Sequence, residues 1–440
     1  MYNFLLEHIL LPLGDLINGS SYIKQLKLWR KIDTYSERDL NALQIKNLQA
    51  VLQEALQNVP YYKNLEVSSE KEVNLNDFPI IDKNIIRTEV DQLISNRYQK
   101  KKLIPYSSSG STGTQTTVYM TKQEQSVLRG ILTHWWEWSG YKIGKPIVQT
   151  GITPQRGFLK TIKDKLFRTI YINAFSHTHD QLKNVCEKVQ RSSNFFFAGY
   201  ASSLNVIAEY AIENKYNITS KGVISLGDKL FDHYKKNIKK AFKAKTYDTY
   251  GSNEGFMIAA QDDLDYYYML SPHVFVEIVD DDNQPIKDGE IGHIVVTRLD
   301  CFSMPLIRYK IGDLGVKLPI DEYPIKRKYN YPLLKKVVGR ETDIVLLPDA
   351  TKLVVHSFTG IFEYIKEIKQ FKVIQNDKSG IIIEYIKSST FEETALKRAE
   401  KELRNYIKDN KFSIIFKEVS SIASSKSGKP QIIESRLKNE

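Results

Sequence analysis

The middle of the chain, from about residue 122 to residue 260, constrains the fold most. Amphipathic segments at helical spacing alternate there with short apolar runs that favour β-strands. Residues 222–227 are typical of a short buried strand, residues 231–244 of a basic helix, and residues 245–251 of a strand that leads into a loop. This alternation predicts an α/β fold in which helices and sheet form layers.

Segments before and after this region extend the pattern. A long amphipathic helix is predicted over 36–59 and ends at Pro60, because proline cannot continue a helix. Residues 101–120 place a loop of small residues between two β-prone stretches, which predicts strand, loop and strand. Residues 274–318 are rich in predicted strands, with turns at 280–283 and 287–289.

The last hundred residues form a separate, compact α+β unit. We place its boundary near Gly339 and Arg340, so the chain divides into a large N-terminal nucleotide- and substrate-binding domain, 1–338, and a small mobile C-terminal domain, 339–440. The elements expected in the small domain are a hairpin (344–347 and 352–355), strands at 367–375 and 380–387, a helix over 391–408 and a strand at 412–419.

Length, charge and cysteine content narrow the classes of function. A chain of 440 residues is too long for one ordinary core, and its formal net charge of +11 favours anionic partners such as nucleotides, coenzyme A, anionic membranes or nucleic acid. No zinc-finger spacing or RNA-recognition aromatic motif occurs, so we do not expect a dedicated nucleic-acid-binding protein. Cys186 and Cys301 offer neither a metal-ligand pair nor a disulfide framework, which indicates a reducing cytoplasm.

The N-terminal segment, residues 1–19, is apolar but has no basic leader. Glu7, His8 and Asp15 interrupt it, and Pro12 breaks it. It predicts neither a signal peptide nor a membrane-spanning helix. We expect a surface helix docked on the protein, with a peripheral membrane contact as the alternative.

Four short motifs that can carry chemistry occur in order along the chain. The first, 107–114, is a loop rich in hydroxyl and backbone N–H groups, which could wrap a triphosphate. It lacks the Gly-Lys-Ser/Thr ending of a Walker A loop, and on its own it is equally typical of a plain polar turn. Its candidate phosphate-binding residues are Ser108, Ser109, Gly110, Ser111, Thr112 and Gly113.

The second and third motifs could bind the rest of a nucleotide. The second consists of Tyr250, Gly251, Ser252, Asn253 and Glu254. An aromatic ring can stack on adenine, and a carboxylate can hold Mg²⁺ beside phosphates. The third, 308–315, places Asp313 next to a glycine turn, where its carboxylate can accept both hydroxyls of a ribose. Alone, each motif is more typical of a turn at the end of a strand.

The fourth motif has two parts that lie far apart in the sequence. Arg340 belongs to the first part, 339–343, and Lys429 ends the second, 427–429. A lysine on a Gly-Ser loop is useful if a small domain delivers a cation to the reacting centre. Alone, this loop is more typical of a disordered basic tail.

Taken together, these motifs and their order resemble the adenylate-forming superfamily. The resemblance is closer to the phenylacetate–CoA ligase family and its branch in capsular polysaccharide biosynthesis, the CapK-like proteins. The stretches 197–204, 225–230, 305–309 and 371–375 fit the same branch, and the resemblance covers about residues 50–435. The chain departs from the family pattern at Asp228, where Glu is usual, at Asn253, where a hydroxyl residue is usual, and at Thr114 and Gln115, where Lys-Pro is common.

The resemblance implies a role for each nucleotide-binding motif. The loop 108–116 would cradle the β- and γ-phosphates of ATP. Tyr250 would stack on adenine, with Gly227 and Asp228 near the same base. Glu254 would bind Mg²⁺, and Asp313 would hold the ribose hydroxyls.

The resemblance also implies a role for each basic residue of the fourth motif. Arg340 would lie near the ribose or phosphate at the hinge between the domains. Lys429 would bridge the substrate carboxylate and the α-phosphate of ATP during adenylation. Lys426 lies on the same loop and is the alternative cation, because a flexible serine-rich loop does not fix the register.

The implied function is ATP-dependent activation of a carboxylate as an acyl-adenylate, with release of pyrophosphate and then acyl transfer to a thiol or an amine. Coenzyme A is the family's usual acceptor, and the CapK-like branch adds a sugar or nucleotide-sugar in surface polysaccharide assembly. Two alternatives stay open. One is a catalytically degenerate relative that acts as a binding or scaffold protein, indicated by Asn253, and the other is a basic nucleic-acid-binding protein.

Trp135, Trp136 and Trp138 form an aromatic cluster within a predicted helix. They could line a substrate pocket, but tryptophans at this spacing more often pack in a helix core.

Overall fold

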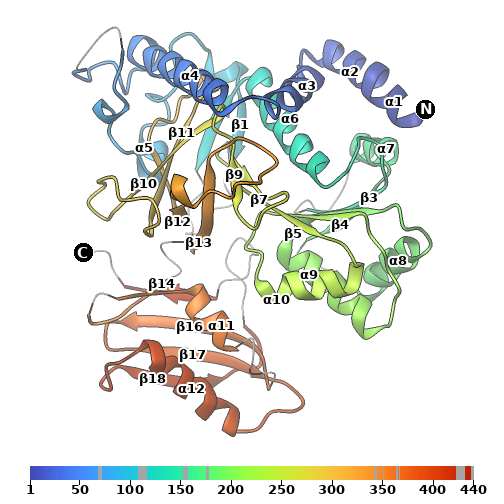
Figure 1. The fold of residues 1–440 in the computed structure, drawn as a ribbon, viewed down its shortest axis with the longest axis vertical. Coiled ribbons are helices and arrows are strands. Elements are labelled where there is room, and N and C mark those ends of the chain that lie inside the picture. The colour runs from blue at the N-terminus through green and yellow to red at the C-terminus, as the bar shows by residue number, and fades with distance from the viewer. Residues whose placement is uncertain are drawn as a thin grey trace.

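The computed structural model describes residues 1–67, 72–107, 116–151, 157–174, 178–340, 344–349, 351–362, 365, 367–422 and 432–437. An 11-stranded sheet with helices on its faces forms the upper part of the molecule in Figure 1, and a four-stranded sheet with its own helices forms the lower part. The predicted α/β fold, with a large multi-layer part followed by a small α+β part, is confirmed.

The large sheet has a parallel half and an antiparallel half, which meet at strand β7. Its strand order is β10-β11-β12-β13-β9-β8-β7-β6-β5-β3-β4. Strands β3 to β7 pair in parallel, and strands from β7 onward to β10 pair antiparallel. Their bounds are β3 Ile147–Gly151, β4 Thr169–Asn173, β5 Phe196–Tyr200, β6 Gly222–Leu226, β7 Thr246–Ser252, β8 Phe256–Ala260, β9 Tyr267–Met269, β10 Val274–Val279, β11 Gly292–Arg298, β12 Tyr309–Lys317 and β13 Leu333–Arg340.

Helices cover both faces of the parallel half. Phe197 and Val223 pack into the cluster formed with α8, α9 and α10, while Phe196 and Ile224 pack on the other face beside Trp136 of α6. Because neighbouring residues in a strand point to opposite faces, strands covered on both sides are apolar throughout. These helices are α6 Lys122–Trp138, α7 Phe158–Leu166, α8 His179–Gln190, α9 Ala201–Glu213 and α10 Asp232–Phe242.

The long helix α4, Glu37–Asn58, covers the antiparallel half. The Ser36 hydroxyl accepts a hydrogen bond from the backbone N–H of Asp39 and caps the helix. Leu48, Val51 and Leu52 are buried in the core that this helix shares with β8, β10, β11 and β12. The predicted helix over 36–59 is therefore confirmed.

The remaining elements of the N-terminal part are short. Strands β1 and β2 pair antiparallel, as the prediction for 101–120 requires. None of the described helices has both the length and the apolar character needed to cross a bilayer. The bounds are α1 Tyr2–Leu5, the π-helix η1 Leu6–Leu10, α2 Leu11–Asn18, α3 Tyr22–Ile32, η2 Leu75–Asp77, α5 Lys83–Thr88, η3 Lys100–Lys102, β1 Ile104–Ser107, β2 Thr117–Met120 and η4 Ile320–Glu322.

The small C-terminal part has a sheet in the order β18-β17-β16-β19 and a separate hairpin, β14-β15. Every predicted element is present, and α11 and β19 are additional. Phe231, just before α10, packs into the core of this small part. Its elements are β14 Ile344–Leu346, β15 Lys352–Val354, α11 Val355–Phe362, β16 Ile368–Asp377, β17 Gly380–Lys387, α12 Thr394–Tyr406, β18 Ser413–Glu418 and β19 Ile433–Ser435.

The tryptophan cluster belongs to the core. Trp135 and Trp138 are buried, and the ring of Trp138 stacks on that of Tyr329 with 4.6 Å between centroids. The expectation of helix-core packing is confirmed. Cys186 and Cys301 are buried free thiols, and burial raises the pKa of each to about 12.

Candidate functional site

The candidate site lies where the two halves of the large sheet meet. The second motif, 250–254, spans the end of β7 and its turn into β8, while Gly227 and Asp228 follow β6, the parallel neighbour of β7. Parallel strands bring their carboxyl ends to one edge of a sheet, which is where open α/β folds bind ligands. The fold therefore brings these two segments to one edge.

Asp313 joins the same place from the antiparallel half. The Tyr250 hydroxyl donates to the Asp313 carboxylate at 2.9 Å, although 63 positions separate the two residues. In the β12–β13 ladder Asp313 pairs in register with Arg340, whose side chain lies outside the described part. The structure thus joins the second motif, the third motif and the start of the fourth.

Glu254 is buried and oriented by one hydrogen bond. Its side chain is buried at 7% relative exposure, and it accepts a hydrogen bond from the Tyr309 hydroxyl at 3.3 Å, the one such bond found for it among the described residues. Burial, and secondly the Glu254 charge, raise the pKa of Tyr309, so this phenol stays a neutral donor at physiological pH. Tyr309 lies within the third motif, but no local pattern there predicts this contact.

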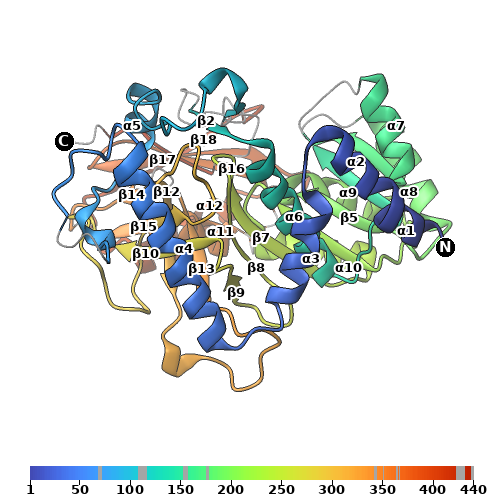
Figure 2. The same ribbon diagram turned by 90° about the horizontal axis from the view of Figure 1, so that it is seen from above.

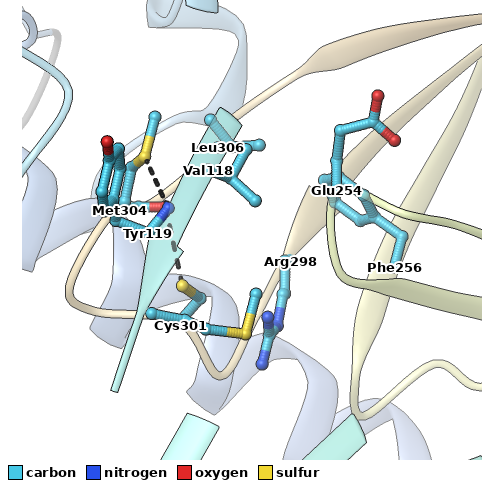
Figure 3. A pocket seen from close by; sticks show the side chains of 9 residues that line it. Val118, Tyr119, Glu254, Phe256, Arg298, Cys301, Met304 and Leu306 are labelled. Atoms are coloured by element: carbon cyan, nitrogen blue, oxygen red, sulfur yellow. Dashed lines mark hydrogen bonds between the residues drawn. The ribbon is translucent and has the colours of Figure 1, made fainter. Parts of the chain in front are cut away.

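A small pocket adjoins Glu254 (Figure 3). Arg298 also lines it, but the Glu254 carboxylate points away from this guanidinium in Figure 3. The Arg298 Nε donates instead to Asp300 at 2.7 Å, and its Nη2 donates to the Glu124 carbonyl at 3.0 Å. Arg298 is thus bound to other groups, and no basic side chain among the described residues forms an ion pair with Glu254. The lining residues are Val118, Tyr119, Met120, Glu254, Phe256, Arg298, Cys301, Met304 and Leu306.

The donor set fits Mg²⁺ held with a nucleotide. Among the described residues, no group of three or more Asp, Glu, His or Cys side chains could form a metal cage. A single carboxylate suits Mg²⁺, which commonly takes one or two protein carboxylates and completes its shell with phosphate oxygens and water. The Ser252 hydroxyl is also buried and has no hydrogen-bond partner among the described residues, as expected for a group that faces a bound ligand. Asn253 beside it is exposed.

Gly251 and Gly227 lie at positions of the site where a larger residue would clash with its neighbours. A Cβ at Gly251 would lie 2.5 Å from the Phe256 carbonyl oxygen, across a register shift in the β7–β8 ladder. Gly227 has φ +80°, and a Cβ there would lie 2.5 Å from the Tyr200 ring. Only glycine meets both conditions without strain.

Asp228 makes contacts that its sequence context did not predict. Its carboxylate accepts hydrogen bonds from the backbone N–H groups of Ala201 and Ser202, at 2.5 and 3.2 Å, at the N-terminus of α9. An acidic group there is favourable because the first helical N–H groups lack partners within the helix. Asp228 therefore fixes the loop after β6 against α9, in addition to any contact with a nucleotide.

A second buried carboxylate, Asp248, lies on β7. The Tyr267 hydroxyl donates to it at 2.5 Å. Burial dominates, however, and raises the pKa of Asp248 from its ordinary value of 3.8 to about 6. Nothing in the sequence distinguishes this residue from a surface aspartate.

The rest of the predicted site falls outside the described residues. This holds for the phosphate loop (Ser108, Ser109, Gly110, Ser111, Thr112 and Gly113), for 341–343, and for Lys426 and Lys429. The ends of the loop are placed, because Ser107 pairs with Thr117 in the β1–β2 ladder. Residues of β2 line the same pocket as Glu254, so the base of the loop lies beside the second motif.

Sequence comparison identifies relatives that fit this arrangement. Residues 346–436 match the family model of the CapK C-terminal domain. Protein CapK of Staphylococcus aureus is 24% identical over the full length of both chains. Phenylacetate-coenzyme A ligase of Pseudomonas putida is 22% identical over 77% of this chain and 78% of its own.

Solved structures of known ligases have the same fold as this chain. 2-Hydroxyisobutyryl-CoA ligase in its postadenylation state, in complex with 2-HIB-AMP, superposes with a TM-score of 0.73 at 17% identity, covering 92% of this chain and 91% of its own. The chain has the fold of the adenylate-forming ligases. The resemblance to this superfamily, and within it to CapK, is confirmed. The same ligase in its thioesterification state superposes less well, with a TM-score of 0.58 at 18% identity and 92% coverage of each chain.

Proposed function

We propose that this protein is an ATP-dependent ligase that activates a carboxylate as an acyl-adenylate and releases pyrophosphate. The observation that carries the proposal is the contact between Tyr250 and Asp313 beside the buried Glu254, three residues from separate parts of the motifs. An aromatic group and carboxylates at one edge of the sheet suit an adenine, a ribose and a metal-bound phosphate chain.

Each residue then has a role. Tyr250 stacks on the adenine, with Gly227 and Asp228 near the base, and Asp313 holds the ribose hydroxyls. Ser252 and Asn253 face the phosphates next to the loop 108–113. Glu254 would hold Mg²⁺, which when bound neutralises phosphate charge. Arg340, opposite Asp313 in the ladder, lies near the ribose or phosphate.

The first step joins two anions, so neutralising charge is its main requirement. A carboxylate oxygen of the substrate attacks the α-phosphorus of ATP, the bond to the bridging oxygen breaks, and pyrophosphate leaves with that electron pair. Lys429 bridges the carboxylate and the α-phosphate, with Lys426 as the alternative cation. Positioning of this kind is worth on the order of a hundredfold or more in rate for one well-placed contact.

The second step transfers the acyl group to an acceptor. A thiol or an amine attacks the acyl carbon, and AMP leaves as the adenylate bond breaks. Coenzyme A is one candidate acceptor, and an amine or a nucleotide-sugar is the other. The likeness to CapK supports a role in surface polysaccharide biosynthesis.

We also propose that residues 339–440 move as a domain relative to 1–338 between the two steps. The better superposition on the postadenylation state supports an adenylation-side arrangement for the conformation described. Phe231, which belongs to the large domain and packs into the small domain's core, would hold this arrangement. Residues 339–343 are the proposed hinge.

ATP–pyrophosphate exchange across a panel of carboxylates tests the proposal. We expect substrate-dependent exchange that requires Mg²⁺. Stoichiometric ADP would indicate an acyl-phosphate mechanism instead. ATP binding with no exchange for any carboxylate would favour the catalytically inactive scaffold protein.

A further inference from the structure

The N-terminal helical segment exposes apolar side chains on the face turned away from the protein. Helices α1, η1 and α2 follow one another without a break over residues 2–18. Large apolar residues recur every three or four positions along their outer side, and the most exposed are Leu16, at 80%, and Ile17, at 83%. We call this surface the N-terminal apolar face; it consists of Phe4, Leu5, Ile9, Leu10, Leu13, Leu16 and Ile17.

An ordinary surface helix turns its apolar side inward and its polar side outward. This segment is apolar on both sides, because Leu6 packs inward against Ile23 and Leu26 of α3 while the outer face is apolar as well. Glu7 is buried and pairs with Arg30 of α3 at 2.6 Å. Asp15 accepts hydrogen bonds from the Ser20 hydroxyl at 2.6 Å and from the Ile23 backbone N–H at 2.8 Å. Both acidic residues are thus satisfied by the protein, which leaves the outward face without a negative charge.

A second helix beside this face has the same character. Tyr2 joins the two, because its hydroxyl donates to the Leu166 carbonyl of α7 and the Arg168 guanidinium lies 4.3 Å from its ring centroid. Figures 1 and 2 both show α7 next to α1 and α2. On α7, Phe158 is 80% exposed and Ile162 is 48% exposed.

The two helices next to the apolar segment, α7 and α3, carry exposed basic side chains. On α7 the exposed lysines are Lys160, Lys163 and Lys165, against one acidic residue, Asp164. On α3, next to α2, Lys24, Lys27 and Lys31 are exposed as well. Apolar side chains flanked by lysine are the features that bind the interface of an anionic bilayer, where the apolar groups enter the acyl region and the lysines meet phosphate groups.

We infer that the N-terminal apolar face docks on a membrane surface rich in anionic lipid. The exposed apolar area costs free energy in water unless something covers it. A second copy of this chain would bring one basic rim against another, whereas anionic headgroups complement the rim. In Figure 1 these helices lie at the far corner from the small C-terminal part, so docking leaves the small domain uncovered.

Vesicle flotation of the full-length protein tests the inference. The probes are vesicles of phosphatidylcholine alone and vesicles of phosphatidylcholine mixed with phosphatidylglycerol. We expect the protein to float with the mixed vesicles, and to float less as salt is raised. The test variant is Leu13→Glu/Ile17→Glu, which we expect to lower binding by about tenfold or more, because the charges oppose insertion into the acyl region.

The matched control is Ile320→Glu/Ile325→Glu. These isoleucines are also exposed, at 68% and 102%, and lie between β12 and β13, away from the N-terminal helices. The control should bind vesicles as the wild type does, and circular dichroism should show both variants folded. Absence of vesicle binding by the wild type, or equal binding by the test variant, would overturn the inference. So would a wild-type dimer that the test variant dissociates without any vesicle binding, because the face would then be a contact between copies.

Discussion

At the scale of single residues, the site depends on a few buried polar groups whose contacts come from distant parts of the chain. Tyr309 donates to Glu254, and Tyr250 donates to Asp313. Each phenol fixes the orientation of one carboxylate, which reduces the freedom that would be lost when a nucleotide binds. The direct test of this arrangement is to remove the negative charge of Glu254 while keeping the shape of its side chain.

Glu254→Gln should lower the rate of pyrophosphate exchange by about a hundredfold at limiting Mg²⁺, with partial recovery at high Mg²⁺. The glutamine can still accept from Tyr309, so the fold should be retained. The exchange rate as a function of Mg²⁺ concentration checks this prediction. Glu290→Gln, on an exposed turn, is the control. A Glu254→Gln protein as active as the wild type at limiting Mg²⁺ would rule out the metal role.

Asp248 should make stability depend on pH. Its pKa is raised from 3.8 to about 6 in the folded protein, so between pH 4 and 6 the folded state binds the proton more readily than the unfolded state does. Stability should therefore fall as pH rises through this window and level off above it. Asp248→Asn removes this titration and should be more stable than the wild type above pH 6, by about 2–3 kcal/mol.

Urea unfolding of both proteins at several pH values from 4 to 8 measures this difference. The gain should shrink towards pH 4, where the wild-type carboxyl is already protonated in the folded state. A variant that is less stable than the wild type at pH 7 would contradict the assignment of burial as the cause.

At the scale of elements, the loop after β6 is the most constrained segment near the site. Asp228 fixes it to the N-terminus of α9, and Gly227 brings its backbone against the Tyr200 ring. The loop also leads to Phe231, which packs into the small domain's core. One short segment therefore links the edge of the sheet that carries the candidate site to the small domain.

Gly227→Ala should destabilise the protein by about 2–4 kcal/mol, because it adds a strained left-handed backbone to a contact with the Tyr200 ring. Gly140→Ala is the matched control, since Gly140 also has a positive φ, +86°, but a Cβ there would meet no atom within 4 Å. The control should lose only about 1–2 kcal/mol. Midpoints of urea unfolding compare the two. Equal losses would show that the contact with Tyr200 relaxes without cost.

At the scale of the whole molecule, the proposed mechanism depends on the small domain presenting one lysine during the first step only. Lys429→Ala should therefore abolish pyrophosphate exchange with the true substrate, yet still transfer acyl groups from chemically supplied acyl-AMP. The two half-reactions are measured separately on the same preparation.

Lys426→Ala is the control for this experiment. Loss of exchange in Lys426→Ala, with exchange retained in Lys429→Ala, would reassign the cation and keep the mechanism. Equal loss of both half-reactions in a folded Lys429→Ala protein would count against the movement of the small domain between steps.

The elements and the motifs could be predicted from local sequence. Helix 36–59, the strands around the first motif and the elements of the small domain follow from local periodicity and from proline and glycine, which act within a few residues. The residues of the second and third motifs could be named for the same reason, since each motif is a short continuous stretch.

Which of these residues meet is a property of the folded chain. Tyr250 and Asp313 come together because β7 and β12 belong to one sheet, whose strand order does not follow the chain. The cap that Asp228 places on α9, the raised pKa of Asp248 and the outward apolar face of α1 and α2 also depend on what packs alongside. Burial and long-range pairing arise only when distant segments pack together, and no local pattern in a sequence carries them.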